Sequence, residues 1–245
     1  MNEVMNLIKS HRSIRKFQER IIEDEIVKEI IEAAQWASSS SFVQAYSVVG
    51  IKNKETKKKL AALSGDQPYV EACPVFLVFC ADLHRLEKAC NMHQTEMMGE
   101  YTESFIMATV DAALAAQNAM LAAESVGLGG VYIGGIRNNP YEVSQLLKLP
   151  EYVYPVFGIC LGYPDQDPER KPRLPMELIY KEEVYTTEHE EEIMKQYDEI
   201  TRQYYFRRTK GKRSDAWTEQ MAEKMEKETR PHMRDFLETK GFKMK

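Results

Sequence analysis

The long apolar segment at residues 103–126 constrains the fold more than any other part of the sequence. At helical spacing it is apolar on nearly every face, with alanines at Ala112, Ala113, Ala115, Ala116, Ala119, Ala122 and Ala123. A helix without a polar face has to be buried on every side. In a chain of 245 residues, a subunit interface is a natural way to cover the second face, and small side chains allow another helix to approach closely. The segment therefore predicts a buried central helix and a homodimer.

The rest of the first two thirds of the chain alternates between short strands and amphipathic helices. Apolar runs predict strands at residues 47–52, 74–81, 131–133 and 156–161. The runs at 74–81 and 156–161 are continuously apolar, which suits strands buried on both faces. Helical periodicity predicts helices at residues 2–10, 24–37, 54–64 and 140–147. This order predicts a fold of the α+β class.

After Lys181 the sequence becomes polar, charged and helical. The pattern predicts two helices, at residues 188–205 and 215–240, joined by a basic loop at 207–214. There is no internal repeat and no low-complexity linker. We therefore expect one domain over residues 1–245, in which residues 188–245 form an extended helical arm.

Composition and motifs exclude several classes of protein. The formal net charge is -5 with Lys and Arg spread along the chain, which argues against a nucleic-acid binder. The four cysteines form no Cys-x-x-Cys pair and the five histidines no paired metal spacing. Residues 1–9 lack the apolar core of a secretion signal. The longest uncharged apolar-rich stretch, 112–123, is shorter than the ~20 residues of a membrane span. We expect a soluble cytoplasmic protein without metal, nucleic-acid or membrane partner.

Two polar segments in the first part of the chain could bind an anionic cofactor. Residues 11–17 (HRSIRKF) offer arginine donors suited to phosphate oxygens and a serine hydroxyl. The alternative is that these cations lie at the C-terminus of a helix and interact with its dipole. Residues 38–44 (SSSSFVQ) could meet the polar edges of a flavin, or could form an ordinary polar loop.

A glycine-rich segment at residues 127–135 (GLGGVYIGG) could let the backbone approach a flat ligand. It does not match the G-x-G-x-x-G dinucleotide motif, and its glycines flank a strand. The backbone N–H of Gly134 or Gly135 could donate to flavin N5. The alternative is a helix stop at Gly127 followed by a tight turn at Gly134 and Gly135.

Two basic segments follow in the last third of the chain. Residues 171–175 (KPRLP) place cations on both sides of a proline that fixes the local backbone. Residues 207–213 (RRTKGKR) could hold the 2′-phosphate of NADPH. The alternatives are an exposed basic loop and a solvated loop between helices.

The order and spacing of these segments resemble the nitroreductase family. The motifs are HRSIRKF near residue 11, SSSSFVQAYS near 38, GDQPYV near 65, FLVFCAD near 76, DAALAAQNAMLAAESVGLGGVYIGGIRNN from 111, and KPRLP at 171. They are most similar to the branch that contains the oxygen-insensitive NADPH nitroreductases and NADPH-flavin oxidoreductases. The resemblance covers nearly the whole chain.

The resemblance implies a central, mainly antiparallel sheet flanked by helices, and a homodimer with two FMN sites at its interface. It places His11, Arg12, Ser13 and Arg173 near the phosphate and ribityl chain, and Arg15 and Lys171 near the N1–O2 edge of the flavin. The ring system would be lined by Ser39, Ser41, Gln67, Tyr132, Ile133, Gly134 and Gly135. Arg208 and Arg213 would contact NADPH. Glu103 would lie near the flavin, and residues 90–101 would form part of a substrate lid.

The implied activity is a ping-pong transfer of hydride from NADPH through FMN N5 to nitroaromatics, quinones or free flavin. The flavin carries this chemistry, so no side chain is expected to act as a nucleophile. One alternative is a dedicated NADPH-FMN reductase that supplies reduced flavin to a partner. A remote alternative is a non-catalytic binding module.

Overall fold

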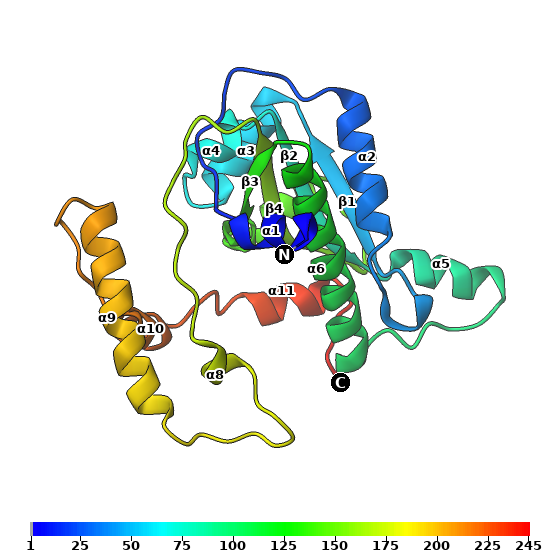
Figure 1. The fold of residues 1–245 in the computed structure, drawn as a ribbon. Coiled ribbons are helices and arrows are strands. Elements are labelled where there is room, and N and C mark those ends of the chain that lie inside the picture. The colour runs from blue at the N-terminus through cyan, green and yellow to red at the C-terminus, as the bar shows by residue number, and fades with distance from the viewer. Residues whose placement is uncertain (1) are drawn as a thin grey trace. The chain divides into compact units, whose positions relative to one another are not determined.

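The computed structural model describes residues 2–245 and divides the chain into two compact units. One, here called the sheet unit, comprises the chain up to Pro168 together with Arg230–Lys245, and the other, the helical unit, comprises Glu169–Thr229 (Figure 1). Residues 230–245 of the expected helical arm therefore belong to the sheet unit. That residues 1–245 form one domain stays a prediction.

The sheet unit is built on four antiparallel strands. They are β1 (Tyr46–Ile51), β2 (Val75–Asp82), β3 (Gly129–Ile133) and β4 (Val153–Gly162), in the order β1-β2-β4-β3. Every pairing is antiparallel, and the β2–β4 register shifts between Phe79 and Cys80. The expected antiparallel sheet and α+β class are confirmed, and the strands lie close to the predicted ranges.

Side chains of β2 are buried alternately on the two faces of the sheet. Leu77 and Phe79 belong to one apolar cluster and Phe76 and Val78 to another. Successive side chains of a strand point to opposite faces. The continuous apolar run therefore forms a central strand with a core on each side, as the sequence predicted.

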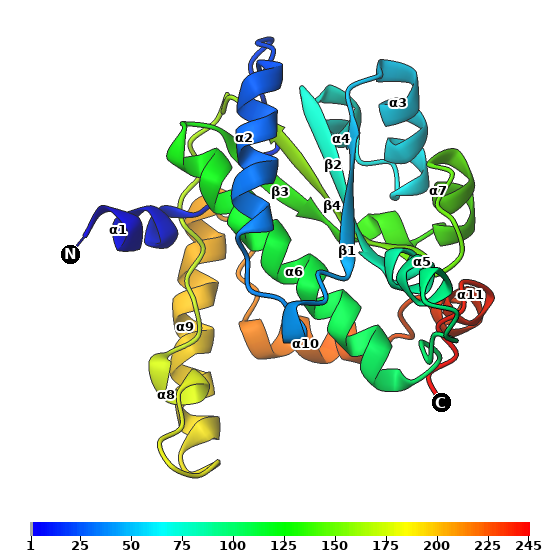
Figure 2. The same ribbon diagram turned by 90° about the vertical axis from the view of Figure 1, so that its right-hand side faces the viewer.

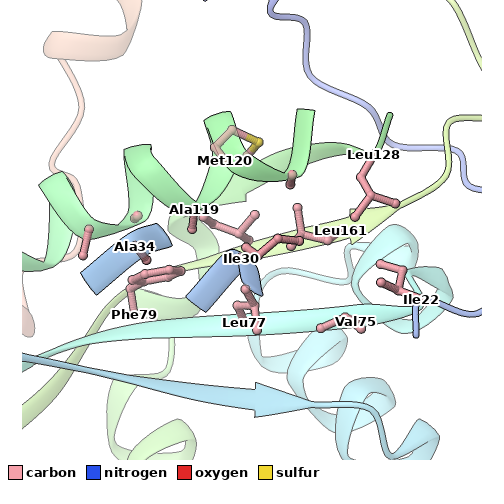
Figure 3. Packing of buried hydrophobic residues seen from close by; sticks show 14 residues of the cluster. Ile22, Ile30, Ala34, Val75, Leu77, Phe79, Ala119, Met120, Leu128 and Leu161 are labelled. Atoms are coloured by element: carbon pink, nitrogen blue, oxygen red, sulfur yellow. The ribbon is translucent and has the colours of Figure 1, made fainter. Parts of the chain in front are cut away.

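One face of the sheet is covered by α2 (Asp24–Gln35) and α6 (Thr102–Ser125). Ile30 of α2 and Met120 of α6 meet β2 and β4 side chains in the cluster drawn in Figure 3, and Figure 2 shows the two helices side by side over the sheet. By length and composition alone α6 could cross a membrane, but it packs against α2 and β2 as a core helix. The predicted central helix is confirmed.

The opposite face is covered by α3 (Lys54–Leu63), α4 (Pro68–Ala72) and α7 (Pro140–Leu146). A third cluster joins Tyr154 of β4 to Phe236 of α11 (Met233–Thr239) and to Phe242. Two single turns, η1 (Ser40–Phe42) and η2 (Gly134–Arg137), follow α2 and β3. The remaining helices of this unit are α1 (Glu3–Ser10) and α5 (His84–Met92).

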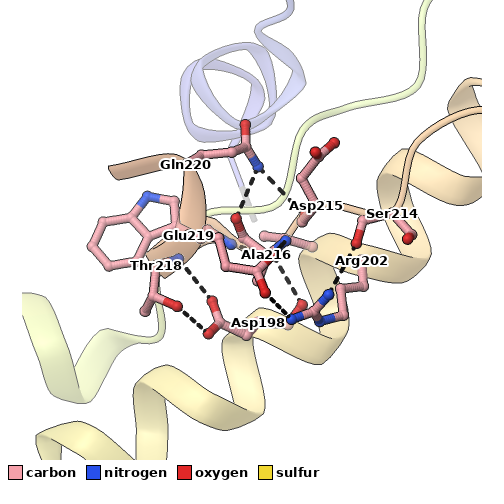
Figure 4. Close-up of polar contacts among 10 residues, drawn as sticks. Asp198, Arg202, Ser214, Asp215, Ala216, Thr218, Glu219 and Gln220 are labelled. Carbon is pink, nitrogen blue, oxygen red and sulfur yellow. Dashed lines mark hydrogen bonds and ion pairs between the residues drawn. The ribbon is translucent and has the colours of Figure 1, made fainter. Parts of the chain in front are cut away.

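The helical unit contains α8 (Met176–Ile179), α9 (Glu190–Arg208) and α10 (Trp217–Met225). Polar contacts fix the start of α10 on α9 (Figure 4). The Thr201 hydroxyl accepts a 3.0 Å bond from Trp217 N, and Asp198 accepts a 2.9 Å bond from Thr218 N. These side chains satisfy N–H groups that a helix N-terminus leaves unpaired.

The prediction of one helix over residues 215–240 is wrong. Helix α10 ends at Met225 and α11 begins at Met233. Arg230 has a left-handed backbone (φ 54°), and Pro231 follows it without an N–H to donate. The break separates the helical unit from the last helix of the sheet unit.

Candidate functional site

The segment at residues 11–15 runs beside strand β3. Ile14 is buried, and its N–H donates to Gly130 O at 2.9 Å. The Nδ1 of His11 lies 2.6 Å from Glu124 Oε1, and Arg12 forms an ion pair of 2.6 Å with Asp167. The backbone is thus fixed at Ile14 and the side chains of His11 and Arg12 are held by carboxylates, while the Arg12 head group stays partly exposed.

Arg12 and Ile14, on either side of Ser13, line a small cavity of about 170 Å³. The carbonyl of Ser13 accepts a bond of 3.4 Å from Gln166 Nε2. The cavity is lined in part by Ser10, Arg12, Ile14, Glu124 and Gln166. This end of the segment could accept a small anionic group beside Arg12.

Arg15 belongs to a chain of contacts that reaches the glycine-rich turn. Its guanidinium lies over the Tyr69 ring, 5.9 Å from the centroid. The Tyr69 hydroxyl donates to Gln67 Oε1 at 2.8 Å, and Gln67 Nε2 donates to Ser64 O at 2.9 Å. Gly135 packs on that carbonyl so closely that an added Cβ would lie 2.2 Å from Ser64 O. The structure therefore brings Arg15, Gln67 and Gly135 together.

The glycine pair itself forms the single turn η2 at the end of β3. Ile133 and Gly135 are buried, whereas Gly134 is partly exposed. A Cβ at Gly134 would meet only Arg137 Nη2, at 3.6 Å. The backbone at Gly134 is therefore open to a ligand. Gly127 follows the end of a helix, as the alternative interpretation of this segment predicted. Helix α6 ends at Ser125, and Gly127 has a left-handed φ of 79°.

Tyr132 lies just before this turn, on β3. Its hydroxyl donates to Gln117 Oε1 at 3.3 Å, and its ring packs edge-on against Phe157 at 5.2 Å. Burial, with a smaller contribution from the negative charge of Glu124, raises the pKa of Tyr132 to about 12. Tyr132 is therefore a neutral hydrogen-bonding group at any physiological pH.

The serine loop, here residues 38–45, has a strained backbone. Ser41, Phe42 and Gln44 all have positive φ, at 45°, 62° and 51°. Each such residue other than glycine costs about 1 kcal/mol or more. Phe42 is 83% exposed, so its own packing does not compensate for the strain.

Asp111 supplies the compensating contacts from helix α6. Its two carboxylate oxygens accept bonds of 3.0 Å each from Ser40 N and Ala45 N, at the two ends of the strained stretch. Hydrogen bonds to a charged group contribute about 1.5–3 kcal/mol each. Sequence reasoning missed Asp111. The sequence did contain a sign of its importance, because Asp111 is the one charged residue between Glu103 and Glu124 in an otherwise apolar helix.

Glu103 lies in the first turn of α6 with an exposed side chain. Within residues 2–245 its carboxylate takes part in no ion pair, and no hydrogen bond joins it to Arg15, Gln67 or the glycine turn. The structure does not bring Glu103 into the cluster around Arg15. Residues 93–101, the greater part of the expected lid, follow α5 without regular secondary structure.

In the helical unit, two predicted cations share one aromatic ring. Lys171 Nζ lies 5.5 Å from the Tyr205 centroid and the Arg213 guanidinium lies 4.9 Å from it. Arg213 also donates to Asp215 at 2.8 Å, and Arg173 donates to Lys171 O at 3.0 Å. Lys171 and Arg213, which the family resemblance assigns to different ligands, are thus neighbours.

A cavity of about 400 Å³ opens beside these cations within the helical unit. Its lining includes Lys171, Arg173, Tyr197, Tyr205, Trp217 and Gln220. Arg208 lies at another ring, where its Nη1 donates to the buried Tyr204 hydroxyl at 2.7 Å. Aromatic walls and cations together suit a flat anionic ligand.

The titratable groups of the described chain contain no cluster of three or more His, Cys, Asp or Glu side chains able to hold a metal ion. Cys73, Cys80 and Cys160 are buried free thiols, and Cys90 is a partly buried one.

Two family models match the chain. The model described as nitroreductase family matches residues 8–163, and that of the nitroreductase family C-terminal domain matches residues 171–245. The chain is 42% identical over 247 residues to an FMN reductase (NADPH) of Bacillus subtilis, covering 99% of both chains. It is 41% identical over 242 residues to an oxygen-insensitive NADPH nitroreductase of Salmonella typhimurium, again covering 99% of both. The solved structure of NfrA1 from B. megaterium is 49% identical and superposes with a TM-score of 0.96 over 99% of this chain and 100% of that one.

Proposed function

The chain belongs to the nitroreductase family, and on that premise we propose that it is an FMN-dependent oxidoreductase that takes its reducing equivalents from NADPH. The observation that carries the proposal is the full-length similarity, above 40%, to relatives named FMN reductase (NADPH) and oxygen-insensitive NADPH nitroreductase. Both names specify NADPH, and one specifies FMN. Coverage of 99% of each chain includes the basic segments at 171–175 and 207–213.

The residues of the sheet unit fit a flat, anionic group such as FMN. Gly134 is partly exposed at a backbone turn, and its buried neighbour Gly135 packs so closely on Ser64 O that it has no room for a side chain. Arg12 and Arg15 supply positive charge, and the serine loop supplies hydroxyls. When bound, FMN would accept hydride from NADPH and pass reducing equivalents to an acceptor.

Each residue would bind or orient the cofactor rather than react with it. Arg12, Ser13 and Arg173 would hold the phosphate and ribityl chain, with His11 presenting its Nε2 because Nδ1 is occupied by Glu124. Arg15 and Lys171 would stabilise negative charge at the N1–O2 edge. The flavin ring would be lined by Ser39, Ser41, Gln67, Tyr132, Ile133, Gly134 and Gly135.

Arg208 and Arg213 would bind NADPH. Arg208 is held by Tyr204, and Arg213 by Asp215 and the Tyr205 ring, so both guanidinium groups are oriented before a ligand arrives. Preorganised arginines lose less conformational freedom on binding and can grip a phosphate with two donors. The two arginines therefore support selection of NADPH over NADH, because only NADPH carries a 2′-phosphate.

We also propose that the protein is a cytoplasmic homodimer. Along α6, Ile106, Val110 and Leu114 recur every four residues and are 43–47% exposed. On α1, Val4 and Ile8 also recur after four residues and are 56% and 51% exposed. Apolar side chains gathered on one helical face favour a subunit interface. The free, mostly buried cysteines suit a reducing compartment.

The acceptor would be a nitroaromatic compound, a quinone or free flavin. A second candidate function is a dedicated FMN reductase, favoured by the relative of that name from B. subtilis. Anaerobic reduction by NADPH in the presence of excess FMN, followed by rapid gel filtration, separates the two. Reduced FMN in the small-molecule fraction at the rate of NADPH oxidation supports the dedicated reductase, and reduced flavin retained on protein supports the general reductase. Protein that takes up no FMN would leave only the binding module.

A further inference from the structure

Asp111 is a buried charge in an unusual position. It is 1% exposed and lies within helix α6, between Ala108 and Ala112, which are core residues of the sheet unit. A buried carboxylate is costly unless hydrogen bonds satisfy it. An apolar residue would suit this helix face equally well, so the charge needs a reason beyond the packing of α6.

Both carboxylate oxygens of Asp111 accept hydrogen bonds from the same loop. Oδ1 accepts from Ser40 N and Oδ2 accepts from Ala45 N, each at 3.0 Å. Between these anchors lie Ser41, Phe42 and Gln44 with left-handed backbones. Inside the loop, Val43 N donates to Ser40 O at 2.9 Å, and two long bonds of 3.4 Å run from Gln44 N to Ser39 Oγ and from Gln44 Nε2 to Phe42 O.

We propose that Asp111 is a positioning residue for the cofactor: it clamps both ends of residues 40–45 and so holds Ser39 and Ser41 in the conformation that contacts FMN. The inference rests on the proposed function. Asp111 would touch neither cofactor nor substrate. Without the clamp, the strained residues relax, and the two hydroxyls lose their fixed positions.

The outer side of the loop is bonded separately. Arg85 Nη1 donates to Gln44 O and to Tyr46 O, both at 3.3 Å, from the start of α5. These bonds reach only the C-terminal end of the loop. Among the described residues outside the loop, Asp111 is the one whose side chain bonds to both ends, which is why its replacement has a specific expected effect.

The test compares Asp111→Asn and Asp111→Ala with a control from the same helix, Thr109→Val. Asparagine keeps the shape and one acceptor oxygen. Thr109 bonds to Phe105 O and to the Tyr154 hydroxyl, so its replacement removes a polar contact of α6 without touching the loop. Two readouts are measured: amide hydrogen exchange of residues 38–46 in cofactor-free protein, and the dissociation constant and visible spectrum of bound FMN.

We expect exchange in residues 40–45 to accelerate about tenfold in Asp111→Asn, and the dissociation constant of FMN to rise about tenfold, with a larger rise in Asp111→Ala. The visible bands of the bound flavin should shift, because the hydroxyls beside it move. Activity at saturating FMN should recover most of its wild-type value. Thr109→Val should leave loop exchange and FMN affinity unchanged.

Unchanged loop exchange in Asp111→Asn, or faster exchange with unchanged FMN affinity and spectrum, would overturn the proposal. If neither Asp111 variant folds, residue-resolved exchange in the wild type decides: Ser40 and Ala45 amides should exchange more slowly than those of Ser41 and Phe42, and equal rates would refute the clamp. A wild-type protein that takes up no FMN would instead refute the proposed function, while the exchange data would still report on the clamp.

Discussion

The guanidinium of Arg15 lies over the ring of Tyr69, 5.9 Å from its centroid. Through the Tyr69 hydroxyl, the Gln67 side chain and the Ser64 carbonyl, this contact is linked to the turn at Gly135. Three segments that are distant in the sequence thus meet at one place. Variants at Arg15 and at Gly135 should therefore have defined local effects.

Replacing Arg15 with alanine should weaken FMN binding about tenfold, because one charged hydrogen-bonding group is lost. Arg15 is exposed, so the free energy of unfolding of the cofactor-free protein should change by no more than about 0.5 kcal/mol. FMN fluorescence titration and chemical denaturation measure the two effects. Lys16→Ala, an exposed cation next in sequence, is the matched control and should alter neither quantity. Equal losses in both variants would remove Arg15 from the site.

Gly135→Ala should destabilise the cofactor-free protein by about 1–3 kcal/mol, because the added Cβ would overlap Ser64 O and force the turn to move. Gly134→Ala is the control for stability, since its Cβ would meet only Arg137 Nη2 at 3.6 Å. Urea denaturation of both variants without FMN gives the comparison. Equal stability of the two variants would mean that the close packing at Gly135 is not present in solution.

Arg208→Ala should raise the KM for NADPH about tenfold while FMN stays bound. The variant also removes a partner of the buried Tyr204 hydroxyl, so Tyr204→Phe is needed to separate binding from packing. Arg207→Ala, whose side chain pairs with Glu169 on the surface, is the matched control. Steady-state kinetics with NADPH and NADH provide the readout. A KM for NADPH that is equal in wild type and Arg208→Ala would remove this arginine from the nucleotide site.

The free energy of unfolding should fall as the pH rises from 10 toward 12. Burial raises the pKa of Tyr154 to about 12, and its usual value is 10.0. In this range the unfolded chain has released the Tyr154 proton and the folded chain still holds it, so alkali favours unfolding. The pKa of Tyr132, also raised to about 12 by burial, adds an effect of the same sign. Tyr154→Phe should show a smaller fall across this range, and a fall identical to that of wild type would contradict the assignment.

Local patterns in the sequence were sufficient for the sheet and the main helices. The apolar run of β2 and the alanine-rich helix α6 carry their periodicity in neighbouring residues, so their type and burial could be read directly. The break between α10 and α11 was missed although Pro231 marks it, because helical periodicity resumes on the far side. The backbone of Arg230, which completes the break, depends on the fold.

The candidate site was only partly accessible from the sequence. Motifs pointed to Arg15, Gln67 and Gly135 separately, but their connection runs through Tyr69, which lies in the GDQPYV motif and was assigned no role there. Asp111 was missed because its function requires knowing which loop lies beside α6. Lys171 and Arg213 meet at Tyr205 through the packing of the helical unit, and such contacts between distant residues leave no local pattern.

The most direct test is the absorbance spectrum of the purified protein after incubation with FMN and removal of free flavin, followed by anaerobic addition of NADPH or NADH. We predict flavin bands that stay with the protein, bleach rapidly with NADPH and bleach slowly with NADH. Protein without flavin bands, or bound flavin that NADPH does not bleach, would contradict the assignment of this chain as an FMN-dependent NADPH oxidoreductase.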